Sequence, residues 1–474
     1  MRQRHRDEEA TPATPSIPPM ELLATTLQLC RNIQIASWQD ESDDELRQLR
    51  SGLLARANGQ YNSHLRRLFG INDALTTSVP ARRKELRDAA VDSMCYRRDN
   101  LGIMAKLGSL YLKQNYSVGH LKTTGLKLVP MVQTLVLDAV LALVFPDNLT
   151  FDGWSVTAAL HAVTTDIDRV FKVAANCDGW RDDKRALKKI ELANQNIKRH
   201  TTVLVSDTCE GSIDQPFDGI FHAYEMLWPV VLRSYLEMFR GIQDKANSKR
   251  IHVVREALRM YPPVQRIQRF YEWGAEVPAG ALEMPCTHVP QQAFSSSTTI
   301  PDLHCTADVL QLQRKSDTPE FEGLKFKPAR WVQDDNEQLW EENCMPFGHG
   351  ELSCPFADFA PELLSKLLNT LMLHLHAKDD KHGCPPTMYA GLNQDESPAF
   401  LQEDVPLSME REAFHDIVLK RRPTAQEHRS SLGIDKTSVT SELPNRSKAF
   451  ASHYGKAETK STRPTKEASC DVKR

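Results

Sequence analysis

An apolar run at residues 128–145 limits the folds open to this chain more than any other segment. The run reads LVPMVQTLVLDAVLALVF, 18 residues in which Gln133 and Asp138 are the most polar members. A helix that spans a bilayer needs about 20 predominantly apolar residues. We therefore expect a buried core helix here, with membrane contact as the alternative.

The overall charge is almost balanced, with 59 Lys and Arg against 62 Asp and Glu and a net charge of -3. A protein that binds nucleic acid usually carries a basic excess, so we expect no nucleic-acid partner. Ten cysteines are scattered without a CxxC pair, which weakens zinc and dithiol-redox interpretations. No apolar segment of signal-peptide type follows the charged start, so we expect a protein that is not secreted.

Composition divides the chain into three parts. Residues 1–19 are charged and then rich in Pro and Thr, which predicts a disordered leader. Residues 423–474 contain ten Lys and Arg against six Asp and Glu with few apolar residues, which predicts a disordered, mildly basic tail. We expect residues 20–422 to form a single domain.

Periodicity predicts helices through most of the region 20–270. From 271 to 335 short segments punctuated by Pro favour short strands and loops, and a last strand is expected at 413–419. The fold class is thus mainly α (α+β), a helical body with a smaller β-rich portion. The clearest predicted helices are 81–93, 183–199, 248–260 and the leucine stripe at 363–375.

Three local motifs follow one another in the C-terminal half. In the first, Glu256 and Arg259 lie three residues apart and can pair on one helix face. The second, FKPARW, places Arg330 in a loop that contains a proline. Alone, each of these is more simply read as an ordinary surface ion pair or loop.

The third motif, FGHGELSCP at 347–355, carries more specific chemistry. Gly348 and Gly350 allow a tight turn and a close approach to a flat partner. Cys354 stands ahead of a predicted helix, where backbone N–H groups favour the thiolate, a good axial ligand for heme iron. The alternative for the motif in isolation is a buried cysteine in a turn.

Taken in this order, the three motifs resemble those of the cytochrome P-450 family, over about residues 70–422 and most strongly from about 250. The resemblance implies a heme buried between the helical body and the β-rich portion, with iron bound by Cys354. It also implies that Glu256, Arg259 and Arg330 form a buried cluster that braces the cysteine loop.

The same resemblance implies further heme contacts. Phe347 and Gly350 belong to the family's heme loop, and Arg269 matches the residue that reaches a heme propionate. Arg87, or else Arg83, is the candidate for a second propionate contact.

The oxygen-activating helix of the family is placed at 216–239. Glu225 matches the family's acid, but Met226 occupies the position of the alcohol that relays protons, and a thioether has no proton to donate. The Ala-Tyr-Glu sequence resembles a divergent, fungal-looking branch. Pro229 cannot donate to the carbonyl of Glu225, so we expect the helix to open there and admit a water. Simple core packing of Met226 is the alternative.

Other departures from the family pattern are local. Leu352 stands where an Arg usually binds a propionate, and Phe356 stands where Gly is usual. Pro361 is expected to kink the following helix or delay its start. The span from 225 to 256 is also shorter than the family's.

The resemblance implies a monooxygenase or oxidase that uses O2 and NADPH-derived electrons from a reductase. We expect a small apolar substrate, such as a secondary metabolite, near Phe221, Tyr224 and the 70–82 loop. The alternatives are a degenerate or non-oxygenating heme protein and a peroxide- or rearrangement-type enzyme. The expected location is cytoplasmic or peripheral to the endoplasmic reticulum, with membrane contact open but no spanning anchor.

Overall fold

The computed structural model divides the chain into two compact units, Met1–Arg422 and Pro423–Arg474. All described residues belong to the first unit, so the predicted leader and tail lie outside them. The described residues are 60–71, 73–95, 108–109, 111–113, 116, 125–145, 153–176, 179–205, 216–240, 249–271, 303–314, 322–332, 340, 344–348, 352–376, 387–390, 398 and 406–420.

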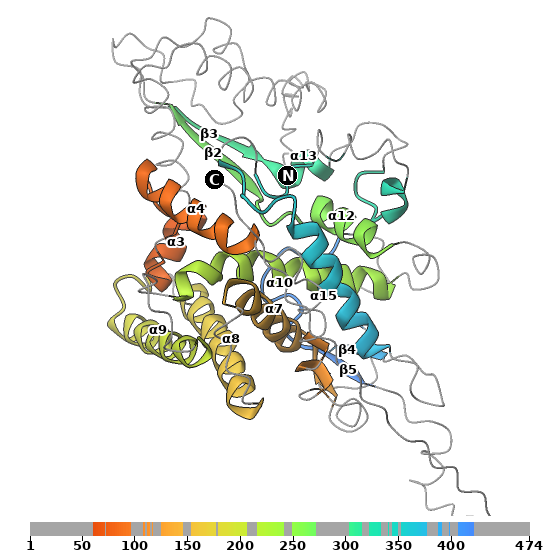
Figure 1. Ribbon diagram of the computed structural model, residues 1–474, viewed down its shortest axis with the longest axis horizontal. Helices are drawn as coiled ribbons and strands as arrows, with labels where there is room; N and C mark the ends of the chain where they lie inside the picture. Colours follow the sequence, from red (N-terminus) through yellow and green to blue (C-terminus); the bar gives the residue numbers. More distant parts are fainter. Residues whose placement is uncertain are drawn as a thin grey trace, which may run out of the picture. The chain divides into compact units, whose positions relative to one another are not determined.

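Two long helices form the centre of the helical body (Figure 1). Helix α7 (Leu128–Val144) fills the apolar run and buries most of its side chains. Helix α10 (Pro216–Arg240) packs against α7 and also contacts helices on its other sides. None of the described helices is long and apolar enough to cross a membrane.

Helices α8 (Gly153–Ala175) and α9 (Lys184–Leu204) pack against each other beside this centre (Figure 1). Asp183 caps the start of α9 by accepting a hydrogen bond from the backbone N–H of Arg185 at 2.7 Å. One face of α9 is buried, at Ala186, Ile190, Ala193, Ile197, Thr201 and Leu204. This spacing of three and four residues leaves the opposite face to solvent.

The remaining described helices either pack on α7 and α8 or carry and adjoin the C-terminal motifs (Figure 1). Helices α12 and α15 lie against each other and against α10. Helix α13 falls in the region 271–335, where the sequence favoured strands and loops. These elements are α3 (Gln60–Phe69), α4 (Pro80–Cys95), α12 (Arg250–Met260), α13 (Val309–Arg314), the 3-10 helix η4 (Pro328–Trp331) and α15 (Ala360–Leu375).

The strands form two small antiparallel sheets, with strand order β1-β5-β4 in one and β2-β3 in the other. The predicted mainly helical fold with a smaller β portion is confirmed. The last strand begins later than predicted, because turns occupy 411–416. The strands are β1 (Leu126–Lys127), β2 (Arg266–Tyr271), β3 (Leu303–Asp308), β4 (Thr387–Ala390) and β5 (Ile417–Lys420).

Candidate functional site

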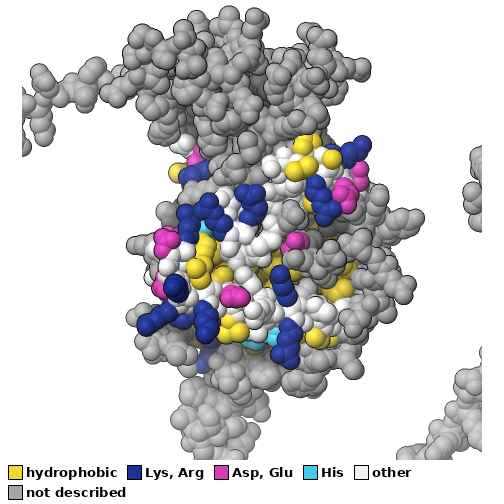
Figure 2. All heavy atoms as spheres, turned by 90° about the vertical axis from the view of Figure 1, so that its left-hand side faces the viewer, with side chains coloured by type: hydrophobic (Ala, Val, Ile, Leu, Met, Phe, Trp, Pro, Cys, Tyr) yellow, Lys and Arg dark blue, Asp and Glu magenta, His cyan; other side chains and the backbone are white. Residues whose placement is uncertain are grey.

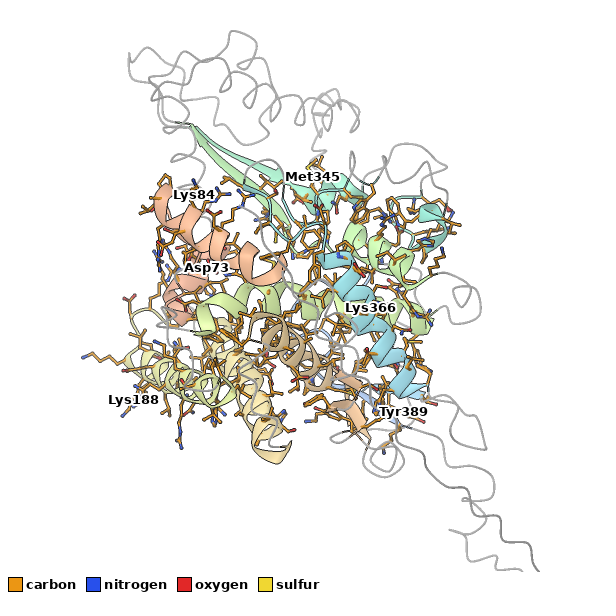
Figure 3. All side chains as sticks on the ribbon, in the orientation of Figure 1. Asp73, Lys84, Lys188, Met345, Lys366 and Tyr389 are labelled. Atoms are coloured by element: carbon orange, nitrogen blue, oxygen red, sulfur yellow. The ribbon has the colours of Figure 1, made fainter. Side chains whose placement is uncertain are left out.

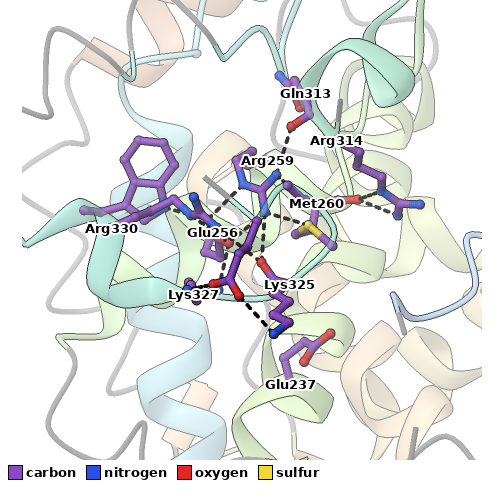
Figure 4. Close-up of polar contacts among 12 residues, drawn as sticks. Glu237, Glu256, Arg259, Met260, Gln313, Arg314, Lys325, Lys327 and Arg330 are labelled. Atoms are coloured by element: carbon purple, nitrogen blue, oxygen red, sulfur yellow. Dashed lines mark hydrogen bonds and ion pairs between the residues drawn. The ribbon is translucent and has the colours of Figure 1, made fainter. Parts of the chain in front are cut away.

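A buried carboxylate on α12 organises the first part of the site (Figure 4). Glu256 is 0% exposed, and Arg259, one helical turn later, is 1% exposed. Arg259 donates from Nε to Glu256 Oε2 at 3.0 Å and from Nη2 to Oε1 at 2.8 Å. This two-pronged contact fixes the carboxylate in the plane of the guanidinium.

The short helix η4 supplies the other donors to Glu256. Arg330 Nε donates to Glu256 Oε1 at 3.1 Å, and Trp331 Nε1 donates to Oε2 at 2.9 Å. The backbone N–H of Lys327 donates to Oε1 at 2.8 Å. The structure therefore brings Glu256, Arg259 and Arg330 together through the carboxylate. The contributions of Trp331 and of the Lys327 backbone had no separate signal in the sequence.

Arg259 also joins α12 to the segments that follow β3. Its Nη1 donates to the backbone carbonyls of Gln313 at 2.9 Å and Gly323 at 2.8 Å, and its Nη2 donates to that of Lys325 at 3.2 Å. One side chain thus ties together α12, α13 and the 322–325 turn (Figure 4).

Hydrogen bonds continue from this cluster to the start of the cysteine loop. In the orientation that satisfies both its groups, the Gln313 amide donates to the Arg259 carbonyl at 2.9 Å and accepts from Met345 N at 2.6 Å. Val264 N donates to the carbonyl of Pro346 at 3.0 Å. The charged cluster and the loop are therefore parts of one connected structure.

Two cysteines have described side chains, and their surroundings differ. Cys344 is buried beside the cluster, and burial raises the pKa of its thiol to about 12, with Arg259 opposing and Glu256 adding to that shift. It is therefore a protonated thiol at neutral pH. Cys354 is only partly buried and packs against the core.

A tight turn positions Cys354. Its backbone N–H donates to the carbonyl of Phe347 at 2.9 Å, which closes the loop between them. Gly348 has a φ of 86° in the left-handed region, which other residues rarely adopt. Phe347 is 8% exposed and anchors the loop in the core. Gly350 lies outside the described residues.

The helix after Cys354 starts several residues later than the sequence predicted. Turns occupy 355–359, and α15 begins at Ala360 with Pro361 in its first turn. The expectation that Cys354 stands just ahead of a helix start is therefore wrong. The structure instead agrees with the delay expected from Pro361, because proline favours the first turn of a helix.

Helix α10 exposes a narrow stripe on an otherwise buried surface. From 220 to 238, only Ala223, Met226 and Pro229 are partly exposed. Their spacing of three places them on one face of the helix. This face is apolar and lacks a hydroxyl group. The helix runs through Pro229 without the predicted interruption, and Arg233 Nη1 donates to the Pro229 carbonyl at 3.2 Å.

Glu225 belongs to a buried charge cluster with Arg411 and Asp168. Arg411 donates from Nη1 to Glu225 Oε1 and from Nη2 to Asp168 Oδ1, the latter at 2.6 Å. Trp228 Nε1 donates to Glu225 Oε2 at 3.4 Å. Burial raises the pKa of Glu225 to about 7, and Arg411 opposes the rise. No sequence pattern pointed to Arg411 or Asp168 as its partners.

This raised pKa predicts how stability depends on pH. Between about pH 4.5 and 7 the folded state retains a proton on Glu225 that the unfolded state has released, so stability falls as pH rises. The fall from this group amounts to about 3 kcal/mol. We expect Glu225→Gln to remove it, so that urea unfolding at pH 5 and pH 7 gives a flatter profile than in the wild type. Glu191→Gln, at an exposed site on α9, should keep the wild-type profile, and equal slopes in all three proteins would contradict the prediction.

A second buried pair holds α10 to the predicted substrate loop at 70–82. His222 Nδ1 contacts Asp73 Oδ2, and Asp73 lies between α3 and α4 (Figure 3). Burial raises the pKa of Asp73, but the facing His222 keeps it below its ordinary value. The predicted substrate contacts Phe221 and Tyr224 are both 0% exposed, so in this structure they belong to the core.

The candidate propionate ligands occupy different settings. Arg83 and Arg87 both lie on α4, where Arg83 is buried, at 7% exposed, and Arg87 is exposed. Arg269 lies in β2 opposite Cys305 of β3. The side chain of Arg269 is outside the described part of the structure.

Comparisons with known proteins give structural neighbours only. No family model matches the sequence, and no curated protein matches it significantly. A six-coordinate cytochrome P-450 from Thermus thermophilus is 18% identical, with a TM-score of 0.45 over 68% of this chain and 81% of that chain. The heme domain of a cytochrome P-450DA mutant is 12% identical, with a TM-score of 0.47 over 79% and 87%.

Proposed function

We propose that this chain is a heme-thiolate protein of the cytochrome P-450 type, a monooxygenase or related oxidase for a small apolar substrate. The observation that carries the proposal is the buried Glu256 cluster with its hydrogen bonds to the loop that ends at Cys354. Such a brace holds a loop at fixed geometry, as an axial ligand requires. The fungal-looking branch and a role in secondary metabolism stay predictions.

The residues present fit a heme in their chemistry. A heme-thiolate site needs a soft anionic ligand and apolar walls. Cys354 is partly exposed in a constrained turn, whereas Cys344 is buried and protonated. The partly exposed stripe of α10 offers Ala223, Met226 and Pro229 as an apolar surface.

Each residue has a proposed part in this function. Bound through a thiolate, heme supplies the chemistry of oxygen activation and O–O cleavage. Cys354 provides the thiolate, and Phe347 and Gly350 shape its loop. Arg269 and Arg87 are the proposed propionate partners. An NADPH-dependent reductase is the proposed electron donor, and the proposed location is cytoplasmic or peripheral to the endoplasmic reticulum.

Proton supply separates this function from its alternatives. Met226 cannot donate a proton. Glu225, with a pKa of about 7, is the acid next to Met226 in the sequence, and it can hold and release a proton at neutral pH. We propose it as the general acid, whose loss in Glu225→Gln lowers NADPH-supported turnover about 10²- to 10⁴-fold at constant heme content. If Glu225→Gln leaves turnover unchanged, the result favours the peroxide or rearrangement reaction. If the protein binds heme but turns over no apolar substrate, the result favours a non-oxygenating protein.

The ferrous–CO difference spectrum of the purified protein tests the axial ligand. Cys354→Ser is expected to abolish the red-shifted band typical of a thiolate-bound heme, because a serine hydroxyl is not deprotonated at neutral pH. Cys344→Ser is the matched control and should keep the band. Loss of the band in the control but not in Cys354→Ser would refute the assignment.

A further inference from the structure

The outward face of α9 concentrates positive charge in a protein whose net charge is -3. Its one exposed acid is Glu191, one helical turn from Gln195. Its exposed basic side chains are Lys184, Arg185, Lys188, Lys189, Lys198 and Arg199. At 1.5 Å per residue, the stretch from Lys184 to Arg199 displays them along about 22 Å of α9. In Figure 3, Lys188 extends away from the body of the protein.

The positive charge continues onto α3. Asn194 Nδ2 donates to the carbonyl of Leu68 at 2.6 Å and so fixes α9 beside α3. Burial lowers the pKa of His64 on α3, and the cations Arg181 and Arg67 lower it further. Figure 2 looks onto this side of the molecule, and Lys and Arg side chains are spread across its described part.

Apolar side chains lie among these cations. Leu187 is 41% exposed, Leu192 is 58% exposed and Val203 is 50% exposed. They are three of the eight large hydrophobic side chains that stand exposed among the described residues. A face that only met solvent would gain nothing from them.

We propose that this face of α9 binds the surface of a membrane that contains anionic lipid. The Lys and Arg side chains meet the lipid phosphates and carboxylates, while Leu187, Leu192 and Val203 enter the boundary of the acyl chains. A partner surface that offered acidic charge alone would pair with the cations but leave the apolar side chains in water, whereas one lipid surface meets both. The binding needs no heme, so it holds or fails independently of the proposed heme chemistry, and it would give the proposed peripheral location a specific contact surface.

Sedimentation of the purified full-length protein with lipid vesicles tests the proposal. We expect binding to phosphatidylcholine vesicles that include phosphatidylserine, little binding to phosphatidylcholine alone, and a decline with added salt. Each basic residue near an anionic surface strengthens binding about fivefold. Changing Lys184, Lys188 and Lys198 together to Gln should therefore weaken binding about 100-fold.

Two further variants complete the test. Lys113, Lys127 and Lys366 are exposed lysines outside α9, and changing all three to Gln alters the net charge equally but should leave vesicle binding unchanged. Leu192→Gln should weaken vesicle binding several-fold, with unchanged helicity by circular dichroism. Equal binding to both kinds of vesicle, or equal weakening in the two triple variants, would overturn the proposal. Binding to polyglutamate is the last comparison. If the protein binds polyglutamate as tightly as vesicles, and Leu192→Gln does not weaken that binding, the partner is an acidic protein and the proposal is overturned.

Discussion

Glu256→Ala is expected to lower the free energy of unfolding by about 3–5 kcal/mol. The carboxylate is fully buried and receives hydrogen bonds from Arg259, Arg330 and Trp331. Its removal leaves a buried guanidinium at Arg259 without its counter-ion, and an unpaired buried charge costs more than the lost contact itself. Because the same cluster connects to Met345, the cysteine loop should also lose its fixed geometry.

Urea unfolding followed by circular dichroism measures this loss. Glu191→Ala is the matched control, since that carboxylate is exposed on α9 and its loss should cost within about 0.5 kcal/mol. Glu256→Gln keeps an acceptor oxygen but loses the charge, so its loss of unfolding free energy should lie between those of Glu191→Ala and Glu256→Ala. This variant provides the measurement if Glu256→Ala does not accumulate as folded protein. Equal stability of Glu256→Ala and Glu191→Ala would contradict the role given to the cluster.

Whether the sequence could predict a contact in the Glu256 cluster depends on how many residues separate the two partners along the chain. The pairing of Glu256 with Arg259 follows from helical geometry alone, because residues three apart share a face. Arg330 is 74 residues from Glu256, and no local pattern connects the two. Only the resemblance to an ordered set of family motifs placed it there, and Trp331 at a separation of 75 had no such support.

In the Glu225 cluster, by contrast, the sequence identified one member and none of its partners. Arg411 lies 186 residues from Glu225 and 243 from Asp168, in a segment of turns without periodicity. Neither partner belongs to a motif, so the sequence pointed to Glu225 but could not predict what it touches. Packing of α8, α10 and the 406–416 segment decides this contact, and sequence periodicity does not specify such packing.

Short strands were missed for a related reason. β1 has two residues and β4 has four, too few for alternation to distinguish a strand from a loop. Their existence depends on pairing with β5 from both sides. Helices α9 and α15 were predicted because burial of one face repeats over several turns, whereas α7 was predicted from its continuous apolar run.

Arg411→Met is expected to destabilise the protein by about 3–5 kcal/mol at neutral pH. The guanidinium is the cation shared by Glu225 and Asp168, and it lies 4.3 Å from the Phe171 ring centroid and 5.1 Å from that of Trp228. Methionine retains much of the packing but leaves two carboxylates facing each other without a cation. The loss should shrink toward pH 5, because protonation of Glu225 then removes one of the charges.

A double-mutant cycle isolates the charge contribution. Combining Arg411→Met with Glu225→Gln removes a cation and an anion together. The double variant should lose about 1–3 kcal/mol less unfolding free energy than the two single variants lose in sum. Replacing a buried ion pair by neutral groups of similar volume is often close to neutral in stability, whereas breaking it on one side is not. Additive losses, with no dependence of the Arg411→Met deficit on pH, would mean that Arg411 acts through packing on Phe171 and Trp228 and not through its charge.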